Sequence, residues 1–378
     1  MDYSKIPSTA FVLEEKLLRD NLSLIKNVQD QAGIEIILAF KGFAMWGAFP
    51  IVREYIKGAT ASSLYEARLC FEEMKTKAHT YAAAYVPDEF EELMSYSSHI
   101  VFNSVAQFNK YYPQTLTAGH KISCGIRINP EQSDVEIDLY NPSSPKSRLG
   151  VLKDFMPETL PEGVEGLHFH VLCESDSYSL GRTLIALEKR FGEYLHQIKW
   201  INMGGGHLMT RKGYDTKHLI NLLKAFKEKY NIHILLEPGS AFAWETGVLT
   251  STVLDIVESR GVKTAMLDVS FTAHMPDTLE MPYRPKIVGA SDPDENSKNV
   301  YRLGGTSCLA GDFMENYAFE NELHIGDTII FKDMIHYTMV KTTMFNGVKH
   351  PDLCIWTLDN TLKTLRKFSY EDYKSRLS

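Results

Sequence analysis

The sequence has no long hydrophobic run. Among its 378 residues, no stretch reaches the roughly 18 uncharged apolar residues that suggest a membrane-spanning helix. Residues 1–10 also lack the apolar segment of a secretory signal peptide, so we expect a cytoplasmic protein with no membrane partner. Basic stretches are short and the formal net charge is −8. This balance argues against nucleic acid as a partner and is compatible with a cationic small molecule.

Cysteine is scarce, and the familiar cysteine motifs are missing. The five cysteines, an odd number, are scattered without a Cys-x-x-Cys pair. We therefore expect neither a disulfide framework nor a zinc site, and we predict no metal. The motif Gly-x-Gly-x-x-Gly is also absent, which argues against a dinucleotide-binding fold.

The first two thirds of the chain alternate between two patterns. Amphipathic stretches with apolar residues every three or four positions, such as 180–198 and 218–230, separate short apolar runs. The runs are Ile34–Phe40, His99–Phe102, Ile122–Ile128, Gly166–Phe169, Trp200–Met203 and Ile232–Leu236. Strands that alternate with helices indicate a parallel sheet, and this number of units predicts a closed (β/α)₈ barrel over residues 11–247.

The pattern changes after Val248. Residues 250–258 and 327–344 are rich in β-branched and aromatic residues, and Gly-containing turns interrupt this part of the chain. These features predict a mainly antiparallel β-domain, built from residues 1–10 and 248–378.

Polar residues follow several of the predicted barrel strands, where the chemistry of such barrels takes place. Lys41 ends the first run. It suits a lysine that attaches a carbonyl cofactor, although a rim lysine with its amine in water would look the same. His168 lies within the fourth run and His170 follows it, and we expect one of them to line the barrel mouth.

Two further strand ends complete the pattern. Gly204, Gly205 and Gly206 come directly after a strand, and their N–H groups could cradle a phosphate. Glu237 ends the next strand, and a turn of Pro238-Gly239-Ser240 follows it. A lysine, a phosphate cradle, a histidine and a carboxylate for a ring nitrogen together describe a site for pyridoxal 5'-phosphate.

These residues resemble the fold-type III pyridoxal-phosphate enzymes, and within them the basic amino-acid decarboxylases. The matching phrases run from "PSTAFVLEEKL" at Pro7 to "VKTTMFNG" at Gly347, and they include "AFKGF", "GLHFH", "GGG", "EPG" and "GGTSCLAGD". The resemblance implies an alanine-racemase-like barrel with a C-terminal β-domain. It also implies a homodimer in which each active site draws on both chains.

The resemblance assigns a role to each matching residue. Lys41 would attach the cofactor, and Cys308, on a loop that enters the neighbouring subunit's site, would donate a proton. The other implied cofactor contacts are His170, Gly204, Gly205, Gly206, Glu237, Gly239, Ser240 and Tyr337.

The phrases "HFHVLCE" and "HMPDTLEMPYRP" resemble the decarboxylases of carboxylated polyamines. Two differences separate the chain from its neighbours in the family. Ser240 stands where diaminopimelate decarboxylases usually have an Arg for a distal carboxylate, and residues 171–174 replace the "VGSG" of ornithine decarboxylases. Diaminopimelate or another basic amino acid remains the alternative substrate.

A polyamine precursor carries ammonium groups that need acidic partners when they lose water. The candidates are Glu174, Asp277, Glu280 and Asp312, and any of them can equally be a solvated loop acid. An amino-acid racemase would normally lack Glu237 and would use a Tyr in place of Cys308. A catalytically inactive regulator would be expected to have lost Lys41 or Cys308.

Overall fold

A ring of parallel strands forms one of the two structural units, residues 21–242. The structure, a computed structural model, describes residues 1–135, 141–144, 146–281 and 283–378. The strands are β2 (Glu35–Ile36), β3 (Leu38–Ala39), β4 (Ala59–Ala61), β5 (Ala78–Tyr81), β6 (Ser97–Phe102), β7 (Ser123–Arg127), β8 (Val164–His168), β9 (Trp200–Asn202) and β10 (His233–Leu236). They lie in the order β2-β10-β9-β8-β7-β6-β5-β4-β3.

The ring closes through β2 and β3, which are two halves of one strand interrupted at Ile37. The Ile37 N–H donates to the carbonyl of Leu236 at 2.9 Å, on the β10 side. The Leu38 N–H donates to the carbonyl of Gly58 at 3.1 Å, on the β4 side. The first strand therefore joins both ends of the row, which confirms the predicted barrel.

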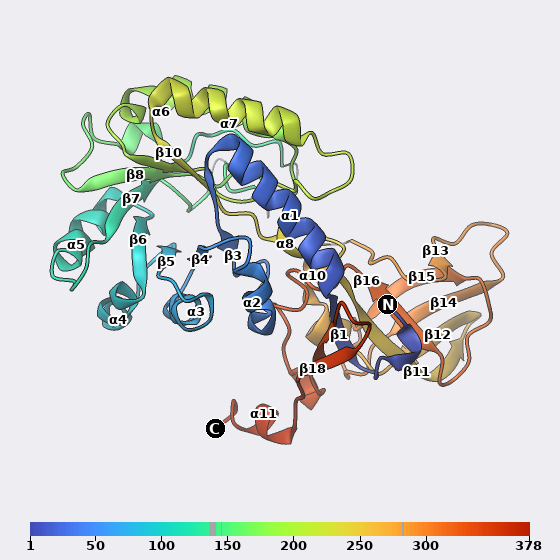
Figure 1. Cartoon of the computed structure of the whole chain (residues 1–378). Helices are drawn as coiled ribbons and strands as arrows, with labels where there is room; N and C mark the ends of the chain where they lie inside the picture. Colours follow the sequence, from blue (N-terminus) through green and yellow to red (C-terminus); the bar gives the residue numbers. More distant parts are fainter. Residues whose placement is uncertain (136–140, 145, 282) are drawn as a thin grey trace. The chain divides into compact units, whose positions relative to one another are not determined.

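Helices cover the outside of this ring (Figure 1). They are α1 (Glu15–Ala32, whose first turns belong to the other unit), α2 (Phe49–Val52), α3 (Leu64–Leu69), α4 (Phe90–Ser95), α5 (Val105–Thr115), α6 (Ser177–Leu195), α7 (Thr216–Tyr230) and α8 (Ser240–Ala243). Ser63, Ser104, Asp176 and Asp215 cap four of them by accepting a backbone N–H of the first turn. Such caps satisfy donors that have no partner within the helix, so each short loop ends where its helix begins.

Trp200 shows how the interior of the barrel is filled. It packs with Ile37, Val101 and Leu235 in a buried cluster. A Cβ atom at Gly125 would lie 2.4 Å from the Trp200 ring, and one at Gly166 would lie 2.1 Å away. Glycines on two neighbouring strands therefore make the space that the indole occupies.

Residues 1–20 and 243–378 form the second unit. Its strands are β1 (Ala10–Glu14), β11 (Gly247–Ser259), β12 (Val262–Leu267), β13 (Ala290–Ser291), β14 (Asn299–Gly304), β15 (Phe313–Phe319), β16 (Thr328–Lys332), β17 (Asp352–Trp356) and β18 (Leu362–Arg366). Its short helices are α9 (Phe271–His274), α10 (Pro276–Glu280) and α11 (Tyr370–Lys374).

The sheet of this unit runs β13-β15-β14-β12-β11-β1-β17-β18, and β16 also pairs with β11. Most pairs are antiparallel, as predicted, but β1 with β17 and β12 with β14 are parallel. A buried cluster that includes Val12, Val248, Cys354 and Trp356 packs on the central strands. The chain's first strand is thus fixed among strands from its last third.

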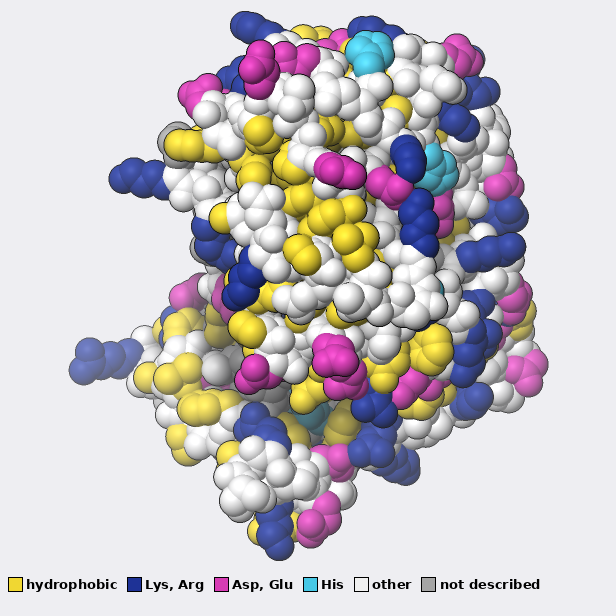
Figure 2. Space-filling model, turned by 90° about the vertical axis from the view of Figure 1, so that its left-hand side faces the viewer, with side chains coloured by type: hydrophobic (Ala, Val, Ile, Leu, Met, Phe, Trp, Pro, Cys, Tyr) yellow, Lys and Arg dark blue, Asp and Glu magenta, His cyan; other side chains and the backbone are white. Residues whose placement is uncertain are grey.

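Acidic and basic side chains are interspersed on the face of the molecule that Figure 2 shows. In the described parts of the chain, no helix is long and apolar enough to cross a membrane.

Candidate active site

Lys41 and His170 meet at the ends of their strands. Lys41 follows β3 and His170 follows β8, and Lys41 Nζ lies 3.3 Å from His170 Nε2. The Gly205 N–H donates to His170 Nδ1 at 3.0 Å. Because an N–H can only donate, Nδ1 must accept, and in the neutral ring the proton lies on Nε2. The His170 ring therefore directs its N–H toward the Lys41 amine.

The surroundings of Lys41 disfavour its positive charge. The Lys41 side chain is exposed on one side, and the surrounding groups of the barrel mouth remove part of the water from its amine. This desolvation is the main influence that lowers the pKa of Lys41, followed by the positive charge of Arg127. Burial also lowers the pKa of His170 well below its usual value. A less charged amine beside a neutral imidazole is the state that a nucleophilic lysine requires.

Arg127 lies beside Lys41 and His170. It ends β7 and is almost fully buried. Its guanidinium lies 4.6 Å from the centre of the Tyr81 ring and donates to the His170 carbonyl at 3.1 Å. The buried cation is thus held by an aromatic face and a backbone oxygen.

Glu237 lies at the end of β10 with its carboxylate inside the barrel mouth. Burial raises its pKa, and the strongest opposing influence is the Asn202 amide, which donates to Oε1 at 2.6 Å. His168 Nε2 lies 3.7 Å from the other oxygen, and burial lowers the pKa of His168 well below its usual value. Both histidines therefore lie in the site. We expected only one there, but His168 ends β8 close to Glu237, and His170 follows it and contacts Lys41.

Glycines let three backbone segments come together here. A Cβ atom at Gly42 would lie 2.6 Å from the Gly239 backbone, and one at Gly205 would lie 2.5 Å from the Glu237 carbonyl. Gly204 has φ +68°, and a Cβ atom there would lie 2.5 Å from the Phe169 carbonyl and 2.6 Å from His170 Cβ. No other residue type would leave this backbone in place.

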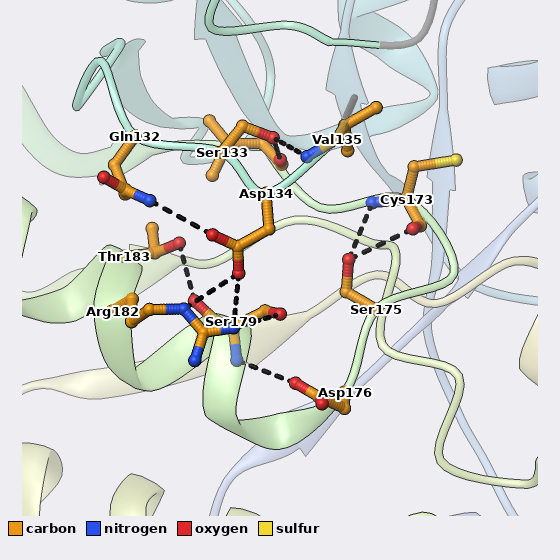
Figure 3. A network of polar contacts seen from close by, with 11 residues as sticks. Gln132, Ser133, Asp134, Val135, Cys173, Ser175, Asp176, Ser179, Arg182 and Thr183 are labelled. Carbon is orange, nitrogen blue, oxygen red and sulfur yellow. Dashed lines mark hydrogen bonds and ion pairs between the residues drawn. The ribbon is translucent and has the colours of Figure 1, made fainter. Parts of the chain in front are cut away.

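The segment after His170 is held by the loop that follows β7. Figure 3 shows Asp134 of that loop paired with Arg182 of α6, at 2.6 Å and 3.0 Å. The Ser133 hydroxyl donates to the Val171 carbonyl at 2.5 Å. Further along, the Ser175 hydroxyl accepts from the Cys173 N–H and donates to the Cys173 carbonyl. These contacts fix the backbone between His170 and α6.

One substrate-site candidate, Glu174, and its neighbour Cys173 lie on this backbone. Glu174 follows Cys173 with φ +45° and an exposed side chain. Burial raises the pKa of the Cys173 thiol, and the charge of Lys41 opposes this. Cys173 therefore belongs to the surroundings of the lysine, although the sequence did not mark it as a site residue.

Cys308 belongs to the other unit, in a loop between β14 and β15. Its side chain is exposed, and its N–H donates to Asn346 Oδ1 at 2.9 Å. Asp312 supports the loop from inside, because its two oxygens accept from the N–H groups of Thr272 and Ser307 at 3.0 Å each. The Asp312 carboxylate is therefore engaged in hydrogen bonds that stabilise the loop, and Cys308 lies on a backbone that these bonds hold in place.

The remaining predicted residues of this unit have partners of their own. Asp277 is buried, and its Oδ2 accepts from the hydroxyls of Tyr283 at 2.8 Å and Thr338 at 2.7 Å. Glu280 pairs with Lys341. Tyr337 follows the short link after β16 with φ +40°, next to the ring of His336.

The arrangement fits pyridoxal 5'-phosphate. It offers an amine of lowered pKa, a neutral histidine beside it, a buried carboxylate, and glycine backbone that a Cβ would block. In the described ranges, no group of three His, Cys, Asp or Glu side chains could hold a metal ion. A barrel that carries a lysine, a glycine cradle and a carboxylate at its strand ends, together with a β-domain, defines the class of fold-type III pyridoxal-phosphate enzymes.

The comparisons with known proteins agree with this class. Residues 64–335 match the family described as "Pyridoxal-dependent decarboxylase, C-terminal sheet domain". The chain belongs to this family of pyridoxal-dependent decarboxylases. It is therefore an enzyme, a carboxy-lyase, and its cofactor is pyridoxal 5'-phosphate.

Two relatives and one solved structure cover nearly the whole chain. A carboxyaminopropylagmatine decarboxylase of Synechocystis sp. is 50% identical, with 99% of this chain and 96% of the relative covered. A carboxynorspermidine/carboxyspermidine decarboxylase of Campylobacter jejuni is 46% identical over all of both chains. The crystal structure of the Campylobacter jejuni carboxynorspermidine decarboxylase complexed with norspermidine has a TM-score of 0.90 at 44% identity, covering 98% of this chain and 100% of that one.

Proposed function

We propose that this enzyme decarboxylates carboxynorspermidine and carboxyspermidine, releasing CO₂ and norspermidine or spermidine. The main support is the full-length relative that is 46% identical and bears the name of this activity. The norspermidine complex of a structurally similar enzyme adds to it. The cytoplasmic location expected from the sequence stays a prediction.

In this proposal the barrel residues hold the cofactor. Lys41 would attach the cofactor, the His170 ring would contact it, and the N–H groups around Gly204–Gly206 and Gly239-Ser240 would bind its phosphate. Tyr337 is a further phosphate contact. Glu237 would pair with the ring nitrogen and keep it protonated. The bound cofactor supplies an electron sink for the bond that breaks.

The reaction exchanges a carboxylate for a proton at one carbon. The bond between Cα and the carboxylate breaks, CO₂ leaves, and the electron pair stays on the Cα side. The Cys308 thiol then gives a proton to Cα and recovers one from solvent, so the net reaction consumes one proton. Lys41, whose lowered pKa favours the neutral amine, would hold the cofactor between turnovers.

The distal end of the substrate decides between two related activities. Carboxyaminopropylagmatine is the second candidate, because the 50% identical relative is named for it. The acids proposed for this end are Glu174, Asp277, Glu280 and Asp312. The exposed Glu174 has its carboxylate available, whereas the other three already have partners in the chain.

A substrate panel tests the proposal. Purified enzyme with its cofactor is given carboxynorspermidine, carboxyspermidine, carboxyaminopropylagmatine, meso-diaminopimelate, ornithine, lysine and arginine. CO₂ release is followed and the amine product is weighed by mass spectrometry. We expect kcat/KM for the two carboxypolyamines to exceed that for the amino acids by at least about 10²-fold, since unpaired polar groups discriminate strongly. A preference for meso-diaminopimelate would contradict the proposal.

We also propose that the enzyme is a homodimer with shared active sites. Trp46 and Tyr65 follow the strands β3 and β4 and leave 57% and 79% of their surfaces exposed. Leu309, beside Cys308, is also half exposed. Exposed aromatic groups near the barrel mouth and an apolar loop tip suit surfaces that a second chain covers.

A further inference from the structure

Asn202 is a buried amide that no part of the proposed chemistry uses. It ends β9 and exposes 1% of its surface. Its Oδ1 accepts from the Gly204 N–H at 2.9 Å, and its Nδ2 donates to Glu237 Oε1 at 2.6 Å. One side chain therefore contacts both the loop Gly204–Gly206, called the glycine loop below, and the Glu237 carboxylate.

The orientation of this amide follows from its partners. The Gly204 N–H can only donate, so the group that faces it must be the amide oxygen. The NH₂ group then faces Glu237, where it meets an acceptor. If the amide were reversed, its NH₂ group would face the Gly204 N–H, which is also a donor. Its oxygen would face the Glu237 carboxylate, which is also an acceptor. The contacts thus allow one arrangement.

A backbone hydrogen bond closes the connection. The Glu237 N–H donates to the Gly204 carbonyl at 2.7 Å. Asn202, Gly204 and Glu237 are therefore joined pairwise by three hydrogen bonds. Movement of the glycine loop would shift the amide, and movement of the amide would shift the carboxylate. This rigidity is the kind that a pre-organised site needs.

Of the groups that favour the ionised Glu237 carboxylate, this amide has the largest effect, followed by the Lys41 charge, the Thr60 hydroxyl and the Arg127 charge. The neutral His168 lies 3.7 Å from Glu237 Oε2, beyond hydrogen-bond distance. Neither of its ring nitrogens has a hydrogen-bond partner among the described residues. Burial favours the protonated form of this carboxylate, so the loss of its strongest donor would favour uptake of a proton.

We propose that Asn202 is a positioning residue that couples the two ends of the cofactor site. Its NH₂ group keeps Glu237 ionised and aimed at the ring nitrogen, while its oxygen holds the Gly204 peptide that shapes the phosphate cradle. The inference rests on the proposed roles of Glu237 and the glycine loop, and it is independent of which polyamine precursor is the substrate.

Asn202→Leu tests the coupling by cofactor binding to the apoenzyme. Three ligands are titrated by fluorescence: pyridoxal 5'-phosphate, its analogue with carbon in place of the ring nitrogen, and pyridoxal without phosphate. Wild type should prefer the first over both others. In Asn202→Leu we expect each preference to fall about tenfold or more, the scale of hydrogen bonds to charged groups. Equal losses for all three ligands would show that the amide is merely structural.

Asn202→Asp gives a second readout that survives if Asn202→Leu does not fold. A protonated carboxyl can still donate to Glu237, whereas an ionised one cannot. We therefore expect kcat near wild type at low pH and a progressive loss as the pH rises. Asn129→Asp is the matched control, because Asn129 is also buried and its Oδ1 accepts from the Glu131 N–H at 2.8 Å. A wild-type pH profile for Asn202→Asp would overturn the proposal.

The substrate panel separates this inference from the proposed function. An unexpected substrate preference leaves the ligand preferences of Asn202→Leu unchanged. An unchanged ligand preference leaves the panel result standing.

Discussion

Single residues at the barrel mouth owe their chemistry to where the backbone puts them. Lys41 and His170 are ordinary titratable groups, and desolvation together with the Arg127 charge shifts both toward their neutral forms. The Gly205 N–H then decides which nitrogen of the imidazole carries the proton. Backbone geometry thus selects both a protonation state and a tautomer.

Lys41→Ala should reduce decarboxylation to the background rate, because the amine is the proposed attachment point of the cofactor. Borohydride reduction of the wild-type holoenzyme, followed by peptide mass spectrometry, should find the cofactor on Lys41. Lys121→Ala is the control, since that amine is mostly exposed and pairs with Glu165 at 2.9 Å. Label on another lysine would refute the assignment.

Glu237→Gln should lower kcat by about 10²-fold or more, the scale of losing one directed electrostatic contact. The amide keeps the size of the side chain but cannot hold a negative charge opposite the ring nitrogen. Glu35→Gln is the matched control, because Glu35 pairs with His233 at 3.1 Å where their strands begin. A normal kcat in Glu237→Gln would mean that the ring nitrogen is protonated by another group.

At the scale of elements, the glycine loop after β9 has no room for side chains, because a Cβ atom at any of its three glycines would lie within 2.5 Å of another atom. Gly204→Ala adds a methyl group at φ +68°, within 2.6 Å of the Phe169 carbonyl and His170 Cβ. The resulting displacement should weaken binding of pyridoxal 5'-phosphate by at least about tenfold. Equilibrium dialysis of the cofactor measures this loss.

Gly192→Ala is the control for that change. Gly192 lies in α6, and its added methyl group would meet nothing within 4 Å. It should leave cofactor affinity unchanged and raise the free energy of unfolding by about 0.5–1 kcal/mol. Equal cofactor affinity in Gly204→Ala and wild type would show that the loop yields without consequence.

The strands β5 and β6 carry a stacked histidine pair, with the rings of His79 and His99 3.8 Å apart. Burial lowers the pKa of His99 to about 4 and that of His79 well below its usual value; His233 lowers the pKa of His99 further and Glu35 opposes this. In the unfolded chain these two histidines have a pKa near the usual value of about 6.5. The unfolded chain therefore binds more protons than the folded chain between about pH 6.5 and 4. Stability should therefore be fully present above pH 6.5 and be lost as the pH falls.

For His99 alone, the loss approaches roughly 3 kcal/mol across this window. Urea unfolding at pH 7.5, 6 and 5 measures it. His99→Gln should flatten the pH dependence by about 1 kcal/mol per pH unit at most, whereas His196→Gln, at an exposed position, should leave it unchanged. An unaltered slope in His99→Gln would contradict the argument.

The sequence predicts the barrel elements to the extent that they are long and apolar. The run Ile232–Leu236 stands out, and β10 is found there as His233–Leu236. The strands β4 and β5, with the sequences ATA and AHTY, are too short and too polar for periodicity to reveal. The interruption of the first strand at Ile37 depends on pairing with both β10 and β4, which no local pattern encodes.

The sequence predicts the site at those positions where the residue type alone indicates a chemical role. A lysine, three glycines and a Glu-Pro-Gly turn at strand ends point to the cofactor. Asn202 was missed because its importance comes from its contact with Glu237, 35 residues away in the sequence. Its position at the end of β9, two residues before Gly204, was the available signal. Likewise, nothing local shows that Asp312 supports a loop.

For the whole molecule, the comparisons leave assembly as the main question, because Cys308 and Lys41 belong to different structural units. If each site combines the barrel of one chain with the Cys308 loop of the other, Lys41→Ala and Cys308→Ala should each be inactive but should complement one another. In a mixed dimer one site carries both defects and the other carries none. With equal amounts and random exchange, half of the dimers are mixed, so activity should return to about a quarter of wild type.

Mixing Lys41→Ala with Glu237→Gln is the control for this complementation, because both residues lie in the same unit and every site of a mixed dimer then keeps one defect. That mixture should show no activity beyond the residual activity of Glu237→Gln itself. Sedimentation of tagged subunits verifies that exchange has taken place. If exchange is complete and Lys41→Ala with Cys308→Ala still gives no recovery, then Cys308 acts in its own chain's site or takes no part in the proton transfer.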